Sequence, residues 1–130
     1  MTGAAVPIAW NVNAGRVDVV FSDPYDIAEA ERTMKEIYGT PGIGRPLRML
    51  VDVRRSAPPD TEFVVNAINF WQLHVSEMWG ARVAVIAASM AQVDMGEMSQ
   101  RSAESRELPF SVRTFVESEQ AEAERWLHEG

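Results

Sequence analysis

The polar residues best suited to chemistry lie together in one short stretch, between an apolar run and a long apolar segment. They are Asp52, Arg54, Arg55, Ser56, Asp60, Thr61 and Glu62. The expected local structure is a strand, a loop and then a helix, and the free N–H groups and dipole of a helix N-terminus favour negative charge. The stretch therefore predicts a site that binds a partner or carries a phosphate, with Thr61 and Ser56 as candidate acceptors.

No group of residues has the pattern of a catalytic centre. His74 and Glu77 are three apart, which would suit a metal pair on a helix, but the only other histidine is His128 near the chain end. A Ser-His-Asp arrangement that combines Ser56 or Ser89 with His74 lacks the turn that exposes a nucleophilic serine. We therefore expect no catalytic residue, no metal, no cofactor and no enzymatic activity.

The composition fits one globular domain with a sizeable core. The chain has 130 residues, of which 46% are hydrophobic and 24% charged, and it contains no cysteine. The formal net charge of −7 argues against a nucleic-acid partner, because such a partner requires a basic surface. No apolar stretch approaches the ~20 residues of a transmembrane helix, so we expect peripheral membrane contact at most. Residues 1–5 lack the features of a secretory signal and are predicted to be flexible, and residues 6–130 are predicted to form one cytoplasmic domain.

The hydrophobic periodicity predicts strands alternating with helices. The expected strands are a hairpin within 8–21 with its turn at Ala14-Gly15, followed by 47–53, 82–88 and 109–115. The expected helices run from a cap at Asp23-Pro24 to Gly39, and then over 60–79, 90–105 and 118–128. This order, ββαβαβαβα, requires crossovers of one hand and a largely parallel sheet with an antiparallel edge. We therefore predict an α/β fold, a single layered domain with a mixed, mostly parallel five-stranded sheet and four helices.

The helix predicted over 60–79 is more apolar than one sheet contact requires. Apolar residues occupy about half of its circumference, whereas a helix on a sheet needs an arc of ~100° or somewhat more. The remaining apolar residues of this helix must face something other than the sheet. A neighbouring helix, a cavity, a membrane-contact face and a subunit interface are the alternatives.

The next predicted helix, which the capping box Ser89-x-x-Gln92 opens, has only a thin apolar stripe. The stripe consists of Ala91, Met95 and Met98, and Gly96 in its middle costs roughly 1 kcal/mol relative to alanine. A weakly held helix of this kind would suit a lid over an apolar pocket, because methionine adapts to irregular space. The candidate pocket residues are Ile68, Trp71, His74, Val75, Met78, Met95 and Met98.

Three stretches of the chain resemble a known family. Leu50-Val51-Asp52-Val53-Arg54 is similar to the family's central strand, 82–86 to the next strand, and 112–127 to the closing strand and a terminal helix that ends in Trp-Leu. On these stretches the chain resembles the SpoIIAA-like branch of the STAS superfamily over about residues 8–127. The resemblance implies a non-enzymatic regulatory module that binds a regulatory protein or a second copy of itself.

The resemblance also bears on single residues. The anti-sigma antagonists of this superfamily carry Asp-x-Ser at the strand end and Asp-Ser-Ser-Gly at the helix start. Asp52 and Asp60 match the two aspartates, and Thr61 falls on the serine that is phosphorylated in that group. Arg54 and Glu62 depart from the pattern, because each stands where the family has a serine. The superfamily is grouped with lipid-binding folds, which implies as an alternative a carrier or sensor of a small apolar ligand under the methionine-rich helix.

Overall fold

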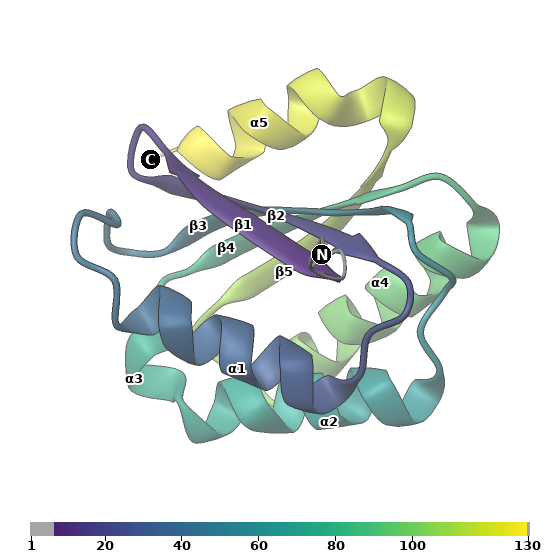
Figure 1. Ribbon diagram of the computed structural model, residues 1–130, viewed down its shortest axis with the longest axis horizontal. Coiled ribbons are helices and arrows are strands. Elements are labelled where there is room, and N and C mark those ends of the chain that lie inside the picture. Colours follow the sequence, from purple (N-terminus) through teal and green to yellow (C-terminus); the bar gives the residue numbers. More distant parts are fainter. Residues whose placement is uncertain (1–6, 130) are drawn as a thin grey trace, which may run out of the picture.

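The computed structural model describes residues 7–129, which form one five-stranded sheet covered by helices (Figure 1). The strands are β1 (Ile8–Asn13), β2 (Arg16–Ser22), β3 (Arg48–Arg55), β4 (Arg82–Ala87) and β5 (Ser111–Val116). They lie in the order β1-β2-β3-β4-β5, with β1 and β2 antiparallel and all other neighbours parallel. The predicted α/β fold with a mixed, mostly parallel sheet is therefore confirmed. The flexible segment predicted for residues 1–5 lies outside the described residues.

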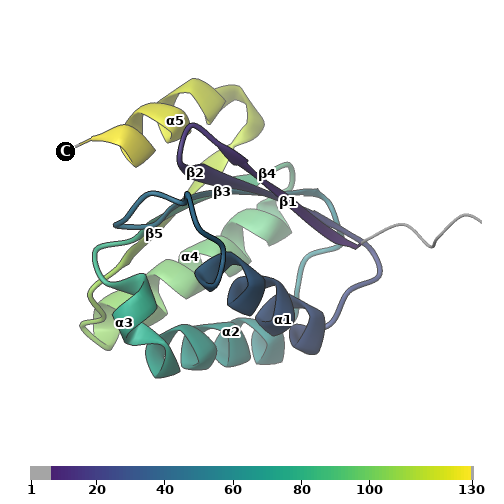
Figure 2. The same ribbon diagram turned by 60° about the vertical axis from the view of Figure 1, so that its left-hand side comes forward.

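The helices cover the two faces of the sheet unequally. They are α1 (Ile27–Tyr38), α2 (Thr61–Leu73), α3 (Val75–Met78), α4 (Met90–Ser105) and α5 (Gln120–His128), with a 3-10 turn η1 (Glu117–Glu119) before α5. When each strand is joined to its parallel neighbour by a crossover of the same hand, the connecting helices all lie on one face of the sheet. Accordingly, α1, α2 and α4 lie on one side of the sheet, and α5, which follows the last strand, lies on the other (Figure 1, Figure 2).

The helix α1 begins three residues later than the sequence pattern predicts. Asp26, not Asp23, is its N-cap. The Asp26 carboxylate accepts from the Glu29 N–H at 2.9 Å, and the Glu29 carboxylate accepts from the Asp26 N–H at 3.0 Å. This capping box satisfies two N–H groups at the helix start. Asp23 instead accepts from the N–H of Ala57 at 2.8 Å, which joins the loop before α1 to the loop before α2.

The single helix predicted over 60–79 is wrong beyond Leu73, because the chain leaves helical geometry at His74. His74 has φ −107° and ψ 38°, and the short helix α3 follows it. Its Nδ1 lies 3.0 Å from the Phe70 carbonyl oxygen, and its ring centroid is 4.3 Å from that of Phe70. Trp79, predicted as the last residue of the long helix, is 68% exposed. The remaining boundaries differ from the predicted ones by two residues or fewer.

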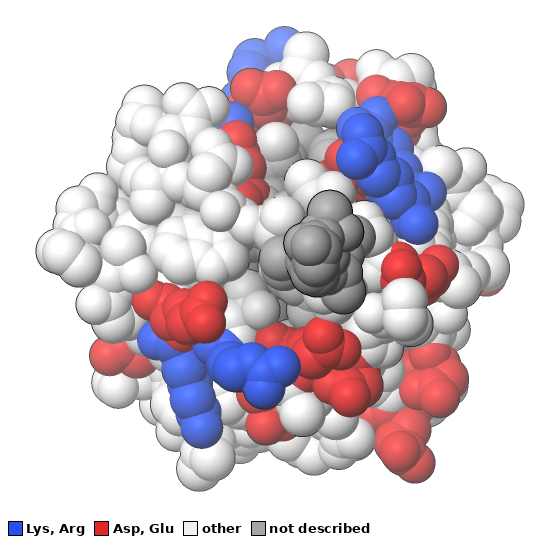
Figure 3. All heavy atoms as spheres, in the orientation of Figure 1, with Lys and Arg blue, Asp and Glu red and all other residues white. Residues whose placement is uncertain are grey.

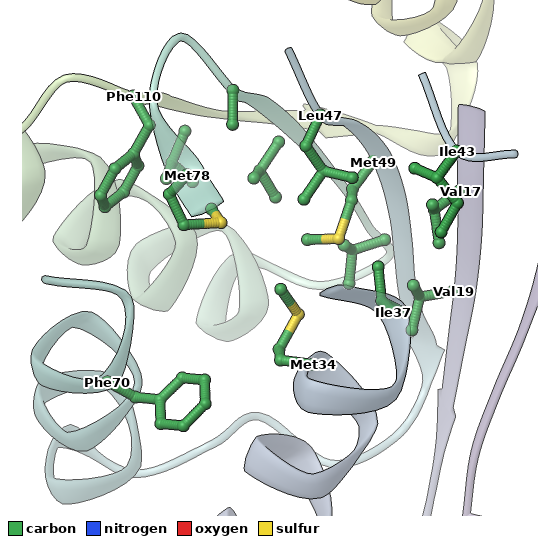
Figure 4. Packing of buried hydrophobic residues seen from close by; sticks show 14 of the residues in the cluster. Val17, Val19, Met34, Ile37, Ile43, Leu47, Met49, Phe70, Met78 and Phe110 are labelled. Atoms are coloured by element: carbon green, nitrogen blue, oxygen red, sulfur yellow. The ribbon is translucent and has the colours of Figure 1, made fainter. Parts of the chain in front are cut away.

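The strand β3 is buried on both faces, because its alternate side chains serve two cores. Met49 faces α1, α2 and α4 in the larger core, where Met34 and Ile37 of α1 approach it (Figure 4). Leu50 faces α5 and packs in a smaller core that includes Leu127. The continuous apolar run of this strand is therefore required by helices on both sides.

The most buried positions of the helix α4 hold small and polar residues, not the predicted methionines. Its buried residues are Gln92, Gly96 and Ala103, whereas Ala91 is exposed and the two methionines of the predicted stripe are half-buried. A Cβ placed on Gly96 would lie 2.0 Å from Thr114 Oγ1. Glycine, which has no side chain, lets the α4 backbone lie directly against β5 at this position. The weak attachment of this helix stays a prediction.

Gly96→Ala is expected to destabilise the protein, although alanine is the better helix former by roughly 1 kcal/mol. The added methyl would overlap the Thr114 side chain, and overpacking of this kind typically costs ~1–3 kcal/mol. Urea denaturation gives the sign and size of the effect. The control is the same change in a Thr114→Ala background, where the loss should be smaller because the hydroxyl and methyl are gone. A stabilising Gly96→Ala would contradict the close contact.

Candidate functional site

Asp52 and Arg54, at the carboxyl end of β3, hold each other in place. Arg54 Nε and Nη2 donate to Asp52 Oδ1 and Oδ2 at 3.0 and 2.8 Å, which is a bidentate ion pair. Arg54 Nη1 also donates to the Glu117 carboxylate, which ties the end of β3 to the turn after β5. The other charged residues of the predicted site are exposed: Arg55, Asp60 and Glu62.

Opposing effects act on the Asp52 carboxyl. Burial by itself raises its pKa, whereas hydrogen bonds from the side chain and N–H of Arg54, together with the charges of Arg54 and Arg55, lower it. The second group of effects outweighs the first, so the pKa of Asp52 lies below its ordinary value of 3.8. Asp52 is therefore ionised at neutral pH and is no proton donor.

The loop after β3 exposes Thr61 and buries Ser56. Asp60 caps α2 by accepting from the Phe63 N–H at 2.8 Å, and Thr61 is the exposed first residue of that helix. Ser56 is only 6% exposed, and its hydroxyl donates to the Val53 carbonyl at 2.9 Å. A kinase could reach Thr61 but not Ser56 in this conformation. Phosphorylation of either residue stays a prediction.

Gln92, a buried residue in the first turn of α4, ties the loop after β3 to the loop after β4. Its Oε1 accepts from the N–H groups of Ala88 and Ser89 at 2.7 and 3.2 Å. Its Nε2 donates to the carbonyl oxygens of Val53 and Ser56, both at 2.8 Å. The amide thereby uses both donors and both acceptor positions. The capping box predicts the bond from Ser89, but the two bonds to Val53 and Ser56 depend on tertiary structure.

A cavity of about 140 Å³ lies between the sheet and the helices α1, α2 and α4. Its walls are almost entirely apolar. Side chains of β1 to β4 form its floor, and the helices supply the rest, including Met34, Phe63, Val64, Ala67, Ile68 and Trp71. The helix α2 packs mainly against α1 and α4, and in both views it is the helix farthest from the sheet (Figure 1, Figure 2). α2 is thus the roof of the cavity, and α4 is one of its walls.

The structure brings together some of the residues predicted to form a pocket. Ile68, Trp71 and Met95 line the cavity. Four others lie outside its lining: His74, Val75, Met78 and Met98. The first three of these stand at or beyond the break that ends α2, and Met78 is fully buried in the larger core instead.

Sequence reasoning missed the contribution of α1 and of the segment before it. Tyr25, Ile27 and Met34 line the cavity. Tyr25 also makes edge-to-face contacts with Phe21 and Phe63, with ring centroids 4.9 and 5.4 Å apart. The apolar spacing within α1 was a signal for one buried face, but it does not show what that face covers.

Three of the polar side chains on the cavity wall, those of Thr33, Gln92 and Ser99, already have partners within the protein. The hydroxyls of Thr33 and Ser99 donate to backbone carbonyls of their own helices at 2.8 and 3.2 Å, and the Gln92 amide is fully bonded. Half-buried Glu31 is the one charged residue among the described lining, which includes no Lys, Arg or His. The cavity therefore offers apolar contact and no positive charge.

Gln92→Leu is expected to lower the free energy of unfolding by roughly 1–3 kcal/mol, because it removes all four hydrogen bonds of the amide, including the buried one to the Ser56 carbonyl. Chemical denaturation measures the loss. Gln100→Leu on the same helix is the control, since that amide bonds only to Glu104 at the surface, and its effect should stay within about 0.5 kcal/mol. Equal, small losses in both variants would show that the buried bonds contribute little.

The Asp52–Arg54 pair should make stability dependent on pH. A lowered carboxyl pKa means that the contribution is complete above the ordinary value of 3.8 and is lost as the pH falls through the lower folded value. The unfolding free energies of the parent and Asp52→Asn should therefore differ at about pH 7 and converge towards about pH 2. A difference that stays constant over this range would mean that the charge of Asp52 does not stabilise the fold.

Binding a metal ion, crossing a membrane and binding a nucleic acid each require a recognisable structural feature. Within residues 7–129, no three His, Asp or Glu side chains are grouped so that they could hold a metal ion. None of the helices in that range combines the length and apolar character needed to cross a bilayer. On the face shown in Figure 3, basic side chains lie in separate groups beside acidic ones and form no continuous basic surface.

Comparisons with protein-family models, curated proteins and solved structures find no match for this chain.

Proposed function

We propose that the chain is a non-enzymatic binding module that holds a small, neutral, apolar ligand in the cavity under α2. The observation that carries this proposal is the apolar cavity of about 140 Å³ between the sheet and three helices. An apolar cavity of ~150 Å³ in another protein stays dry and accepts benzene. The size therefore suits one aromatic ring or a short alkyl chain.

The charge of the wall favours a neutral ligand over a fatty acid. A buried carboxylate head would need a cationic partner, because an unpaired ion is strongly disfavoured in an apolar site. The described lining offers only the like charge of Glu31. The hydroxyls of Thr33 and Ser99 and the amide of Gln92 are engaged within the protein, so the affinity would come mainly from apolar contact.

The roof helix is fastened at its two ends, and between them it carries buried side chains such as Val64 and Ile68 as well as half-buried ones. At its start Asp60 provides the cap. At its far end Arg106 Nη1 donates to Asn69 Oδ1 at 2.8 Å and to Gln72 Oε1 at 3.0 Å. Ala67, between these ends, lines the cavity and is only half-buried. The cap and the Arg106 bonds thus hold both ends of the roof helix in place over the cavity.

A regulatory role for the loop before α2 is a second proposal, as the resemblance to SpoIIAA-like proteins implies. The exposure of Thr61 at the helix start supports it. A phosphate there would add roughly −1.5 to −2 charge to the first turn of the roof helix. The partner would be a regulatory protein or a second copy of the chain, and the same helix would connect this site with the cavity.

Titration with 1-hexanol tests the ligand proposal, with the methyl NMR signals of Ile68 and Met95 as reporters. We expect saturable shifts of both signals, and much weaker binding of hexanoate, which has the same chain and a charged head. Ala67→Leu should weaken hexanol binding roughly tenfold or more, because its added carbons occupy the ligand's volume. Ala91→Leu, the same change at an exposed position of α4, should leave binding unchanged. If neither hexanol nor benzene gives saturable shifts, the proposal is wrong.

A further inference from the structure

Three arginines stand side by side on the face of the sheet that carries α5. Arg16, Arg48 and Arg82 are the first residues of β2, β3 and β4. Arg48 pairs directly with Arg82 in the parallel register, and the pairing of Val17 with Met49 places Arg16 next to Arg48. Neighbouring strands are only ~4.8 Å apart, so each of these positive charges needs a nearby compensating group.

The charge of Arg16 is compensated by the protein itself. Its Nε and Nη2 donate to the two carboxylate oxygens of Asp18 at 2.7 and 3.1 Å, and its Nη1 lies 3.4 Å from Glu124. Arg54 holds Asp52 with the same two nitrogens. In both pairs the carboxylate is two residues away on the same strand, so the fold uses the Nε–Nη2 edge of arginine to bind carboxylates.

The corresponding edges of Arg48 and Arg82 donate to no group within residues 7–129. Arg48 donates only through Nη1, to two backbone carbonyls at 3.2 and 2.9 Å. Arg82 also donates only through Nη1, to the Trp126 carbonyl at 2.6 Å, and the same nitrogen lies 3.8 Å from Glu129. Among residues 7–129, Nε and Nη2 of both side chains have no hydrogen-bond partner.

The sequence explains why these edges are open. Two residues after Arg48 and Arg82 stand Leu50 and Ala84, which pack in the smaller core under α5. The strands therefore supply no carboxylate at the place where β2 supplies Asp18. Burial and the positive charge of Arg82 both lower the pKa of Arg48, so the two guanidinium groups repel each other across the register.

We propose that Arg48 and Arg82 form a binding site for a small phosphate group on the face of the sheet opposite to the cavity. Two guanidinium edges offer four N–H donors, which match the several oxygens of a tetrahedral anion. The ring of Trp126, whose centroid is 5.4 Å from the Arg82 guanidinium carbon, supports one of the two side chains. The site does not depend on the ligand proposed for the cavity.

A titration with inorganic phosphate tests the site on the unaltered protein. The arginine Nε–Hε NMR signals are the readout, and sodium chloride at equal ionic strength is the reference for general salt effects. We expect saturable shifts for Arg48 and Arg82 and none for Arg16, whose edge is occupied. If the Arg48 and Arg82 signals move only as they do in chloride, the proposal is overturned.

Variants of Arg48 distinguish the contribution of its paired N–H donors from that of its positive charge. Arg48→Gln should weaken phosphate binding roughly tenfold or more, and Arg48→Lys should restore only part of it, because lysine keeps the charge but not the paired donors. Arg113→Gln on the same face is the matched control, since this exposed arginine lies over Phe115 and outside the row. Equal phosphate affinity in the parent, Arg48→Gln and Arg113→Gln would exclude the site.

Discussion

The geometry of both loops at the carboxyl end of the sheet depends on one buried amide, that of Gln92. A buried amide must satisfy its donors and acceptors within the protein, and here it does so on two loops that are far apart in the sequence. One of these loops leads into α2 and the other begins α4. The amide therefore fixes the start of the roof helix relative to the wall helix, and with it the shape of the space between them.

Both candidate sites follow from the unequal distribution of helices. Three crossover helices share one face of the sheet, and α2 lies outside direct contact with most of it, bridging α1 and α4. The space beneath α2 is the cavity. The opposite face has only α5, which covers Leu50 and Ile86 in the middle of their strands. The first residues of those strands, Arg48 and Arg82, remain at its margin, where their charges are only partly compensated.

Local patterns predicted the order and type of the main elements, because apolar runs, helical spacing, caps and turn residues mark where most strands and helices begin and end. They failed where tertiary contacts decide between local options. Asp23 and Asp26 are equally good caps by residue type, and only Glu29 three residues after Asp26 distinguishes them. No Gly or Pro marks the break at His74. The buried face of α4 was predicted wrongly, because a prediction from hydrophobicity chooses methionine over glycine as the buried residue. At Gly96, however, the Thr114 side chain on β5 leaves no room for a side chain on α4. The cavity could not be predicted in full, because its size depends on the distance between α1 and α2. The apolar face of α1 does not indicate that distance.

The strand order has a consequence for synthesis of the chain. Each strand pairs with the strand that precedes it in the sequence, so no strand must wait for a later one to be inserted between it and its neighbour. Each parallel pairing closes a loop that contains one helix, and closing such a loop is less costly than closing the longer loop between strands farther apart in the sequence. As the chain leaves the ribosome, the sheet can grow by one strand–helix unit at a time from β1 onward. The last helix, α5, completes the domain by covering a face that is already formed.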